Sequence, residues 1–154
     1  MALTCGLDRM NSQRISLVAT SFLVIAVVSL LLMRTLFAHG TLPISLQALA
    51  GGLMLWARVT FGARSFHAGA NPTEGGLVTT GPYRFVRHPI YSAILLFVWA
   101  GVASHGAIIG ILTAIVATAA IAVRIGTEEV LVVERYPQYA EYARRTKQII
   151  PFVL

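Results

Sequence analysis

The 154-residue chain has little charge. Only 12% of its residues are charged, whereas 56% are hydrophobic. This composition excludes an ordinary soluble domain and is typical of an integral membrane protein, and the length predicts one membrane-embedded domain, 1–154. Acidic residues are scarce, so the formal net charge is +6. The basic residues lie between hydrophobic runs and form no soluble basic face, so we expect membrane lipids as partners and no nucleic acid.

The chain also has almost no cysteine. Cys5 stands alone, which excludes an intrachain disulfide, and no histidine or carboxylate cluster accompanies it. We therefore expect no bound metal. The first hydrophobic run holds 19 residues between Arg14 and Arg34. It is too long for the apolar part of a secretory signal and lacks a clear cleavage site, so we interpret it as a retained span.

The long uncharged runs predict an all-α membrane protein. Arg87 and Arg124 are separated by 36 residues. One helix of that length would reach about 54 Å, against about 30 Å for a hydrocarbon core, so a helical hairpin with its turn between Gly101 and Gly106 is expected. A C-terminal cytoplasmic segment with helical character, 125–154, follows the hairpin. The predicted transmembrane helices are four, with approximate bounds 15–37, 43–61, 89–103 and 107–124.

The basic residues predict the orientation. With four spans and both termini on one side, eleven of the twelve Lys and Arg residues fall on that side, and only Arg34 lies near the other. Because basic residues are enriched in cytoplasmic loops, both termini should face the cytoplasm. The polar connection 62–88 and the segment 125–154 then meet at the cytoplasmic face.

The second arm of the hairpin carries small residues at every fourth position. Such a series favours close helix packing. It could pack on the first arm, on the second span, or on another copy of the chain, so an oligomer is possible. The residues are Gly106, Gly110, Ala114, Thr118, Ala122 and Gly126.

The stretch 77–94 is the densest in polar and aromatic groups, with two arginines, one histidine and two tyrosines within nine residues. Pro82 and Pro89 each stand where a helix could begin. The arginines would suffice to orient a span, but His88 and Tyr91 are not needed for topology. Ionisable groups at a membrane boundary indicate a functional site.

The C-terminal segment supplies the second group of polar residues. Arg124 and Glu128 are four apart and share a helix face, either as a stabilising ion pair or, as we interpret them, as site residues opposite His88. Tyr136, Tyr139 and Tyr142 are expected to be interfacial rings at headgroup depth.

The motifs LVTTGPYRFVRHPIYSA, RIGTEEVLVVERYPQYAEYARR and a terminal IIPF resemble the isoprenylcysteine carboxyl methyltransferase family, whose relatives include phospholipid N-methyltransferases. The resemblance covers about residues 77–154. It implies an S-adenosylmethionine-dependent methyltransferase whose cofactor lies between the loop before the hairpin and the C-terminal segment. The C-terminal segment differs from the family pattern at one place: many members have Phe-Gly where this chain has Tyr136-Pro137.

Carried over residue by residue, the resemblance implies the following roles. Arg124 would meet the substrate and Glu128 would bind the cofactor, both as catalytic residues. The implied cofactor-binding residues are Gly81, Pro82, Tyr83, His88, Tyr91, Ser92, Glu128 and Glu129.

The sequence does not decide between several classes of methyl acceptor. An acceptor carboxylate is already ionised, and a guanidinium can hold it by two parallel hydrogen bonds. A phospholipid amine or a thiol would need a base, for which His88 and Glu129 are candidates. We expect a lipophilic acceptor of the isoprenylcysteine carboxyl type, with phospholipid N-methylation or thiol S-methylation as alternatives.

Two other classes of protein could carry parts of this pattern. Membrane sterol reductases that use NADPH have a similar RHP-x-Y signature but are much longer. A non-enzymatic structural membrane protein would explain the spans, yet it leaves His88, Tyr91, Arg124 and Glu128 without a role.

Overall fold

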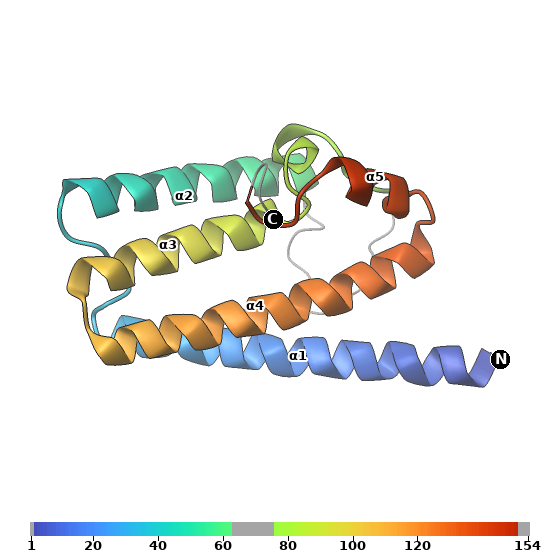
Figure 1. The fold of residues 1–154 in the computed structure, drawn as a ribbon, viewed down its shortest axis with the longest axis horizontal. Helices are drawn as coiled ribbons and strands as arrows, with labels where there is room; N and C mark the ends of the chain where they lie inside the picture. The colour runs from blue at the N-terminus through green and yellow to red at the C-terminus, as the bar shows by residue number, and fades with distance from the viewer. Residues whose placement is uncertain (1, 63–75, 151–154) are drawn as a thin grey trace.

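The computed structural model describes residues 2–62 and 76–150, which fold into helices (Figure 1). Within these two ranges no strand forms, and one isolated parallel bridge joins Val86 to Lys147. The predicted all-α class is confirmed. The helices are α1 (Ala2–Leu32), α2 (Thr41–Phe61), the 3-10 turn η2 (Gly81–Arg84), α3 (Pro89–His105), α4 (Ile108–Arg135) and α5 (Tyr139–Arg145).

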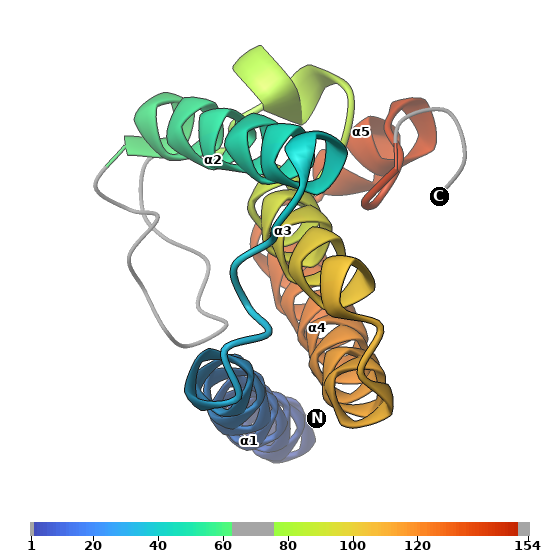
Figure 2. The same ribbon diagram turned by 90° about the vertical axis from the view of Figure 1, so that its left-hand side faces the viewer.

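The four long helices run antiparallel in succession, so the beginning of α1 and the end of α4 lie at the same end of the bundle (Figure 1). α1 packs along α4, and α2 packs along α3 (Figure 2). The predicted hairpin is confirmed, but its turn is shorter than the predicted 101–106, because α3 continues to His105 and Gly106 caps it in the left-handed region at φ 65°. Its two arms diverge from that turn, and η2 and α5 lie at the open end of the wedge (Figure 1).

Three of these helices are long and apolar enough to cross a membrane, over Met10–Leu32, Thr41–Phe61 and Ile108–Arg135. The shorter apolar helix α3 has 17 residues. At 1.5 Å per residue it reaches about 26 Å, somewhat less than a hydrocarbon core of about 30 Å. These helices support the prediction of a membrane protein, while the number of four spans stays a prediction.

The first predicted span, 15–37, is wrong at its C-terminal bound, because α1 ends at Leu32. Arg34 adopts a left-handed φ of 57°, and the N–H groups of Thr35 and Leu36 both donate to one carbonyl of the last turn. This pattern terminates a helix whatever the hydropathy of the residues that follow.

The helix of the predicted fourth span, 107–124, continues beyond it to Arg135. The prediction followed the loss of hydropathy, but Glu and Arg favour helix as strongly as most apolar residues do. The helix stops before Tyr136, because the following Pro137 disfavours the helical conformation of Tyr136. Part of the expected segment 125–154 is therefore a continuation of α4.

The predicted small-residue face of 106–126 is not continuous. Gly110 and Ala114 are buried, but Ala122 and Gly126 are exposed. Positions four apart advance about 40° around a helix at each step, so the series turns away from the packed side. The packed side of α4 lies against α1, a partner that the sequence had not suggested.

Gly101 brings α3 against the connection that follows α1. A Cβ built on this residue would lie 2.0 Å from the carbonyl oxygen of Leu36. The same connection is held by Gln47 of α2, whose amide nitrogen donates to the carbonyls of Leu36 and Phe97 at 2.7 and 3.0 Å. Backbone contact of this kind leaves no room for a side chain.

We therefore expect Gly101→Ala to destabilise the protein by about 1–3 kcal/mol, because overpacking forces the backbone to move. Thermal unfolding in detergent micelles should show a midpoint several degrees lower. The matched control is Gly52→Ala on α2, where an added Cβ meets no atom within 4 Å. Equal midpoints for the two variants would contradict the close approach at Gly101.

Candidate functional site

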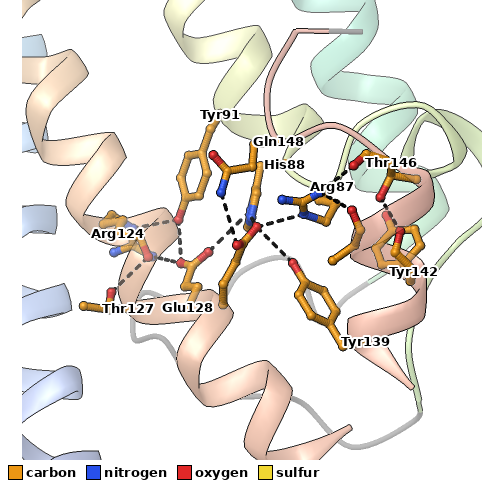
Figure 3. Close-up of polar contacts among 12 residues, drawn as sticks. Arg87, His88, Tyr91, Arg124, Thr127, Glu128, Tyr139, Tyr142, Thr146 and Gln148 are labelled. Atoms are coloured by element: carbon orange, nitrogen blue, oxygen red, sulfur yellow. Dashed lines mark hydrogen bonds and ion pairs between the residues drawn. The ribbon is translucent and has the colours of Figure 1, made fainter. Parts of the chain in front are cut away.

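The site lies where α3 begins and the last turns of α4 pass beside it (Figure 3). His88 caps α3, and Pro89 follows as the first helical residue. Proline suits that position because its fixed φ is helical and no N–H is needed there. This start places His88 and, three residues later, Tyr91 opposite Glu128 and Glu129 of α4.

Arg124, Tyr91 and Glu128 form one closed set of hydrogen bonds. Arg124 donates from Nε to the Tyr91 hydroxyl at 2.7 Å and from Nη2 to Glu128 Oε1 at 2.7 Å. The Tyr91 hydroxyl donates to the same Glu128 oxygen at 2.5 Å. Arg124 also donates from Nη1 to the hydroxyl of Thr20 on α1. The guanidinium is thus fixed by groups from three helices.

The second oxygen of Glu128 is placed differently. Oε2 lies 3.9 Å from His88 Nδ1, which is too long for a hydrogen bond. The Glu128 side chain is 21% exposed, so this oxygen belongs to a largely desolvated carboxylate. In a site of low dielectric such an oxygen attracts a cationic donor more strongly than it would in water.

Glu129 is held from four directions. Its Oε1 accepts from Arg87 Nε at 2.9 Å, from His88 Nε2 at 3.1 Å and from the Tyr139 hydroxyl at 3.2 Å. Its Oε2 accepts from Gln148 Nε2 at 3.1 Å. Because a carboxylate only accepts, His88 carries its proton on Nε2 in this arrangement. Glu129 therefore ties the loop before α3 to α4, α5 and the chain that follows α5.

The chain after α5 lies directly against the loop before α3. The N–H groups of Arg87 and His88 donate to the carbonyls of Lys147 and Gln148 at 2.7 and 3.0 Å. The Ser92 hydroxyl donates to the Ile149 carbonyl at 2.6 Å. The predicted meeting of the loop and the C-terminal segment is confirmed for these residues. Positions 63–75 of the connection lie outside the described residues.

Arg87 adds side-chain bonds to the same junction. Its Nη1 donates to the carbonyls of Ala143 and Thr146 at 2.9 and 2.5 Å. The side chain is 10% exposed. Arg87, which the sequence analysis explained by membrane orientation, is thus a largely buried residue that connects the loop before α3 to the C-terminal part.

Gly81, Pro82 and Tyr83 form η2 and lie against the end of α2. A Cβ on Gly81, whose φ is 56°, would lie 2.6 Å from the Thr60 hydroxyl. Tyr83 packs its ring 5.5 Å from that of Phe61 and accepts a hydrogen bond at its carbonyl from Tyr142. The hydrogen bonds of the two glutamates described above involve none of these three residues.

The tyrosines of the C-terminal part remain neutral hydrogen-bond donors. Burial raises the pKa of Tyr142 to about 12, and burial together with the nearby Glu129 carboxylate raises the pKa of Tyr139 further. Burial also raises the pKa of Tyr83. Since the neutral form of tyrosine carries the O–H, these groups keep their donors well above neutral pH.

The interfacial role predicted for Tyr139 and Tyr142 is wrong for Tyr139, which is 5% exposed and donates to Glu129. Tyr142 is half-buried and donates to the Tyr83 carbonyl. Rings with a hydroxyl suit a membrane interface, but they serve equally as buried donors to a carboxylate. Sequence reasoning also missed Thr20, Arg87 and Gln148. One signal could have identified Arg87. Two adjacent glutamates at a membrane boundary each need a cationic partner, and Arg124 provides only one.

The sequence of this chain is similar to those of known proteins. The family model for phospholipid methyltransferases matches residues 38–139, which include His88, Tyr91, Arg124 and both glutamates. The cobalt-zinc-cadmium resistance protein CzcN of Cupriavidus metallidurans is 40% identical over 81 residues, which cover 49% of this chain and 35% of that protein. The chain therefore spans about a third of that relative's length. No solved structure matches the chain.

The family match extends over more than half of the chain and confirms the resemblance carried by the motifs around His88 and Glu128. The chain belongs to the phospholipid methyltransferase family.

Proposed function

We propose that this protein transfers a methyl group from S-adenosylmethionine to a lipophilic acceptor, at the cytoplasmic face of a membrane. The family match supports methyl transfer. The observation that carries the proposal is the cluster of Arg124, Tyr91, Glu128 and His88 where α3 begins and the last turns of α4 pass, with one Glu128 oxygen beyond hydrogen-bond distance of His88.

The residues of the site fit this cofactor. Its amino-acid end carries an ammonium group, and Glu128 Oε2 lies next to His88 with no hydrogen bond between them. We assign the ammonium contact to Glu128, whereas Glu129, which accepts four side-chain hydrogen bonds, serves chiefly to hold the loop and the tail in place. Bound S-adenosylmethionine would supply a methyl group activated on a sulfonium. The protein's own task is then to orient the acceptor and exclude water.

An apolar cavity beside the site supports a lipophilic acceptor. It measures about 530 Å³ and is lined only by apolar residues and glycine of α1, α2, α3 and the α1–α2 connection. Leu23 and Ile94 line it and also belong to the cluster that packs around Tyr91. An acceptor with its hydrocarbon chain in this cavity would have its polar head near Tyr91 and Arg124. Cavities of this size are typical of ligand sites.

We propose a carboxylate acceptor of the isoprenylcysteine type. Arg124 is 5% exposed, and its Nη2 holds a carboxylate oxygen of Glu128. An acceptor carboxylate would compete with Glu128 for this nitrogen and would need no base, since it is already ionised. The second candidate is a phospholipid amine, which the description of the matched family favours. It would require a base, for which His88 is the candidate, because Glu128 is assigned to the ammonium and Glu129 accepts four hydrogen bonds.

We expect the purified protein to bind S-adenosylhomocysteine with micromolar affinity, measured by calorimetry in detergent micelles. NADPH serves as the control ligand and should give no heat. An absence of both heat and thermal shift at millimolar S-adenosylhomocysteine would contradict the proposal. Labelled S-adenosylmethionine, added to membranes with and without the protein, then identifies the methylated lipid.

A further inference from the structure

Two histidines meet at the end of the bundle remote from the glutamates. His39 lies in the connection between α1 and α2, and His105 is the last residue of α3. Both segments lie at the end of the molecule opposite α5 (Figure 1). Their ring centroids are 4.5 Å apart, with the planes at 81°, and both residues are exposed. The proposed methyl transfer uses neither residue.

The hydrogen bonds around His105 fix its tautomer. Its Nδ1 lies 2.9 Å from the carbonyl oxygen of Gly101, and a carbonyl can only accept. Nδ1 therefore carries the proton, and Nε2 presents a lone pair. Metal-binding histidines commonly donate one ring N–H to a carbonyl in this way while the other nitrogen binds the ion.

Ser104 connects the two histidine segments. Its hydroxyl donates to the Gly101 carbonyl at 2.7 Å and accepts from the backbone N–H of His39 at 3.3 Å. It also lies 3.1 Å from His105 Nδ1. Ser104 thus holds the backbone at His39 beside the His105 ring, and the two rings contact each other.

The separation of the rings suits one shared ion. Zinc binds histidine nitrogen at about 2.0–2.1 Å, so two imidazoles at a right angle on one ion have centroids about 4.5 Å apart, and tetrahedral ligands about 5.2 Å. The observed centroid separation of 4.5 Å equals the value for two imidazoles at a right angle. Imidazole is a good ligand for zinc, copper and nickel.

We propose that His39 and His105 form a two-histidine site for a divalent transition-metal ion, which joins the α1–α2 connection to the end of α3. No cluster of three or more His, Cys, Asp or Glu residues that could hold a metal occurs in the described part of the chain. Water would fill the remaining positions, as the exposure of both rings allows. An ion that binds only the folded protein raises its thermal stability.

The test uses the full chain without an affinity tag, in detergent micelles and with Cys5→Ser so that the thiol does not compete. Zinc chloride is titrated by calorimetry and by thermal unfolding. We expect one saturable ion per chain and a higher unfolding midpoint. His39→Ala and His105→Ala should each weaken zinc binding at least about tenfold and remove the rise in midpoint.

Copper(II) provides a second readout. Its electron paramagnetic resonance spectrum should show two nitrogen ligands in the parent protein and a lower number in either variant. His39→Asn and His105→Asn keep a polar side chain if an alanine variant does not fold. His67→Ala is the matched control and should bind zinc normally. Binding that survives loss of His39 or His105, binding lost in His67→Ala, or no saturable binding at all would overturn the site.

Discussion

Glu128→Gln should lower the affinity for S-adenosylhomocysteine at least about a hundredfold. The substitution keeps the size of the side chain but removes the negative charge beside which the ligand's ammonium would lie. Leaving a charged partner unpaired in a largely buried site costs about 3–5 kcal/mol, and about 1.4 kcal/mol corresponds to tenfold in affinity. Calorimetry of the purified variant measures the effect directly.

Folding must be separated from binding in this experiment, because Glu128 also pairs with Arg124. Circular dichroism and gel filtration of Glu128→Gln should resemble those of the parent. Glu134→Gln, the same exchange at an exposed position of α4, controls for the change in net charge. If the folded Glu128→Gln protein bound S-adenosylhomocysteine as tightly as Glu134→Gln does, Glu128 would not be the ammonium ligand.

Arg124→Lys should reduce turnover about a hundredfold if the acceptor is a carboxylate. Lysine keeps the charge but cannot reproduce the planar two-bond grip, and it would also lose the hydrogen bonds to Tyr91 and Thr20. A displacement of the reacting groups by about 1 Å can cost about a hundredfold in rate. Affinity for S-adenosylhomocysteine should fall much less, because the ammonium contact is assigned to Glu128.

The exchange also distinguishes the two candidate acceptors. With an amine acceptor, lysine should replace Arg124 with little loss of turnover. Arg135→Lys is the matched control, since it makes the same change at an exposed position of α4. Equal losses of affinity and turnover in both Arg124→Lys and Arg124→Ala would mean that Arg124 holds the helix or the cofactor and not the acceptor.

The convergence of His88, Tyr91, Arg124 and Glu128 could be predicted because each depends on local signals. Pro89 marks the start of α3, the spacing of Arg124 and Glu128 places them on one helix face, and the hairpin returns α4 to the beginning of α3. These rules concern spacing and chain direction, which a sequence displays directly.

The contacts that could not be predicted arise from tertiary packing. Thr20 meets Arg124 only because α4 lies along α1, and the apolar surfaces of α1 would have suited any neighbouring helix. The pairing of Arg87 and His88 with Lys147 and Gln148 uses backbone groups, which leave no pattern in the side chains. The four hydrogen-bond partners of Glu129 lie in the loop before α3, in α5 and in the chain after α5, so its spacing from Glu128 alone could not predict them.

The same backbone pairing has a consequence for biosynthesis. Lys147, Gln148 and Ile149 follow the five α-helices of the described residues, yet their carbonyls accept hydrogen bonds from Arg87, His88 and Ser92. Translation proceeds from the N-terminus, so the nascent helices are made before these partners leave the ribosome. The junction around Glu129 can therefore close only on a chain whose synthesis has passed residue 149, and a translation product arrested after α5 would carry both glutamates without a complete site.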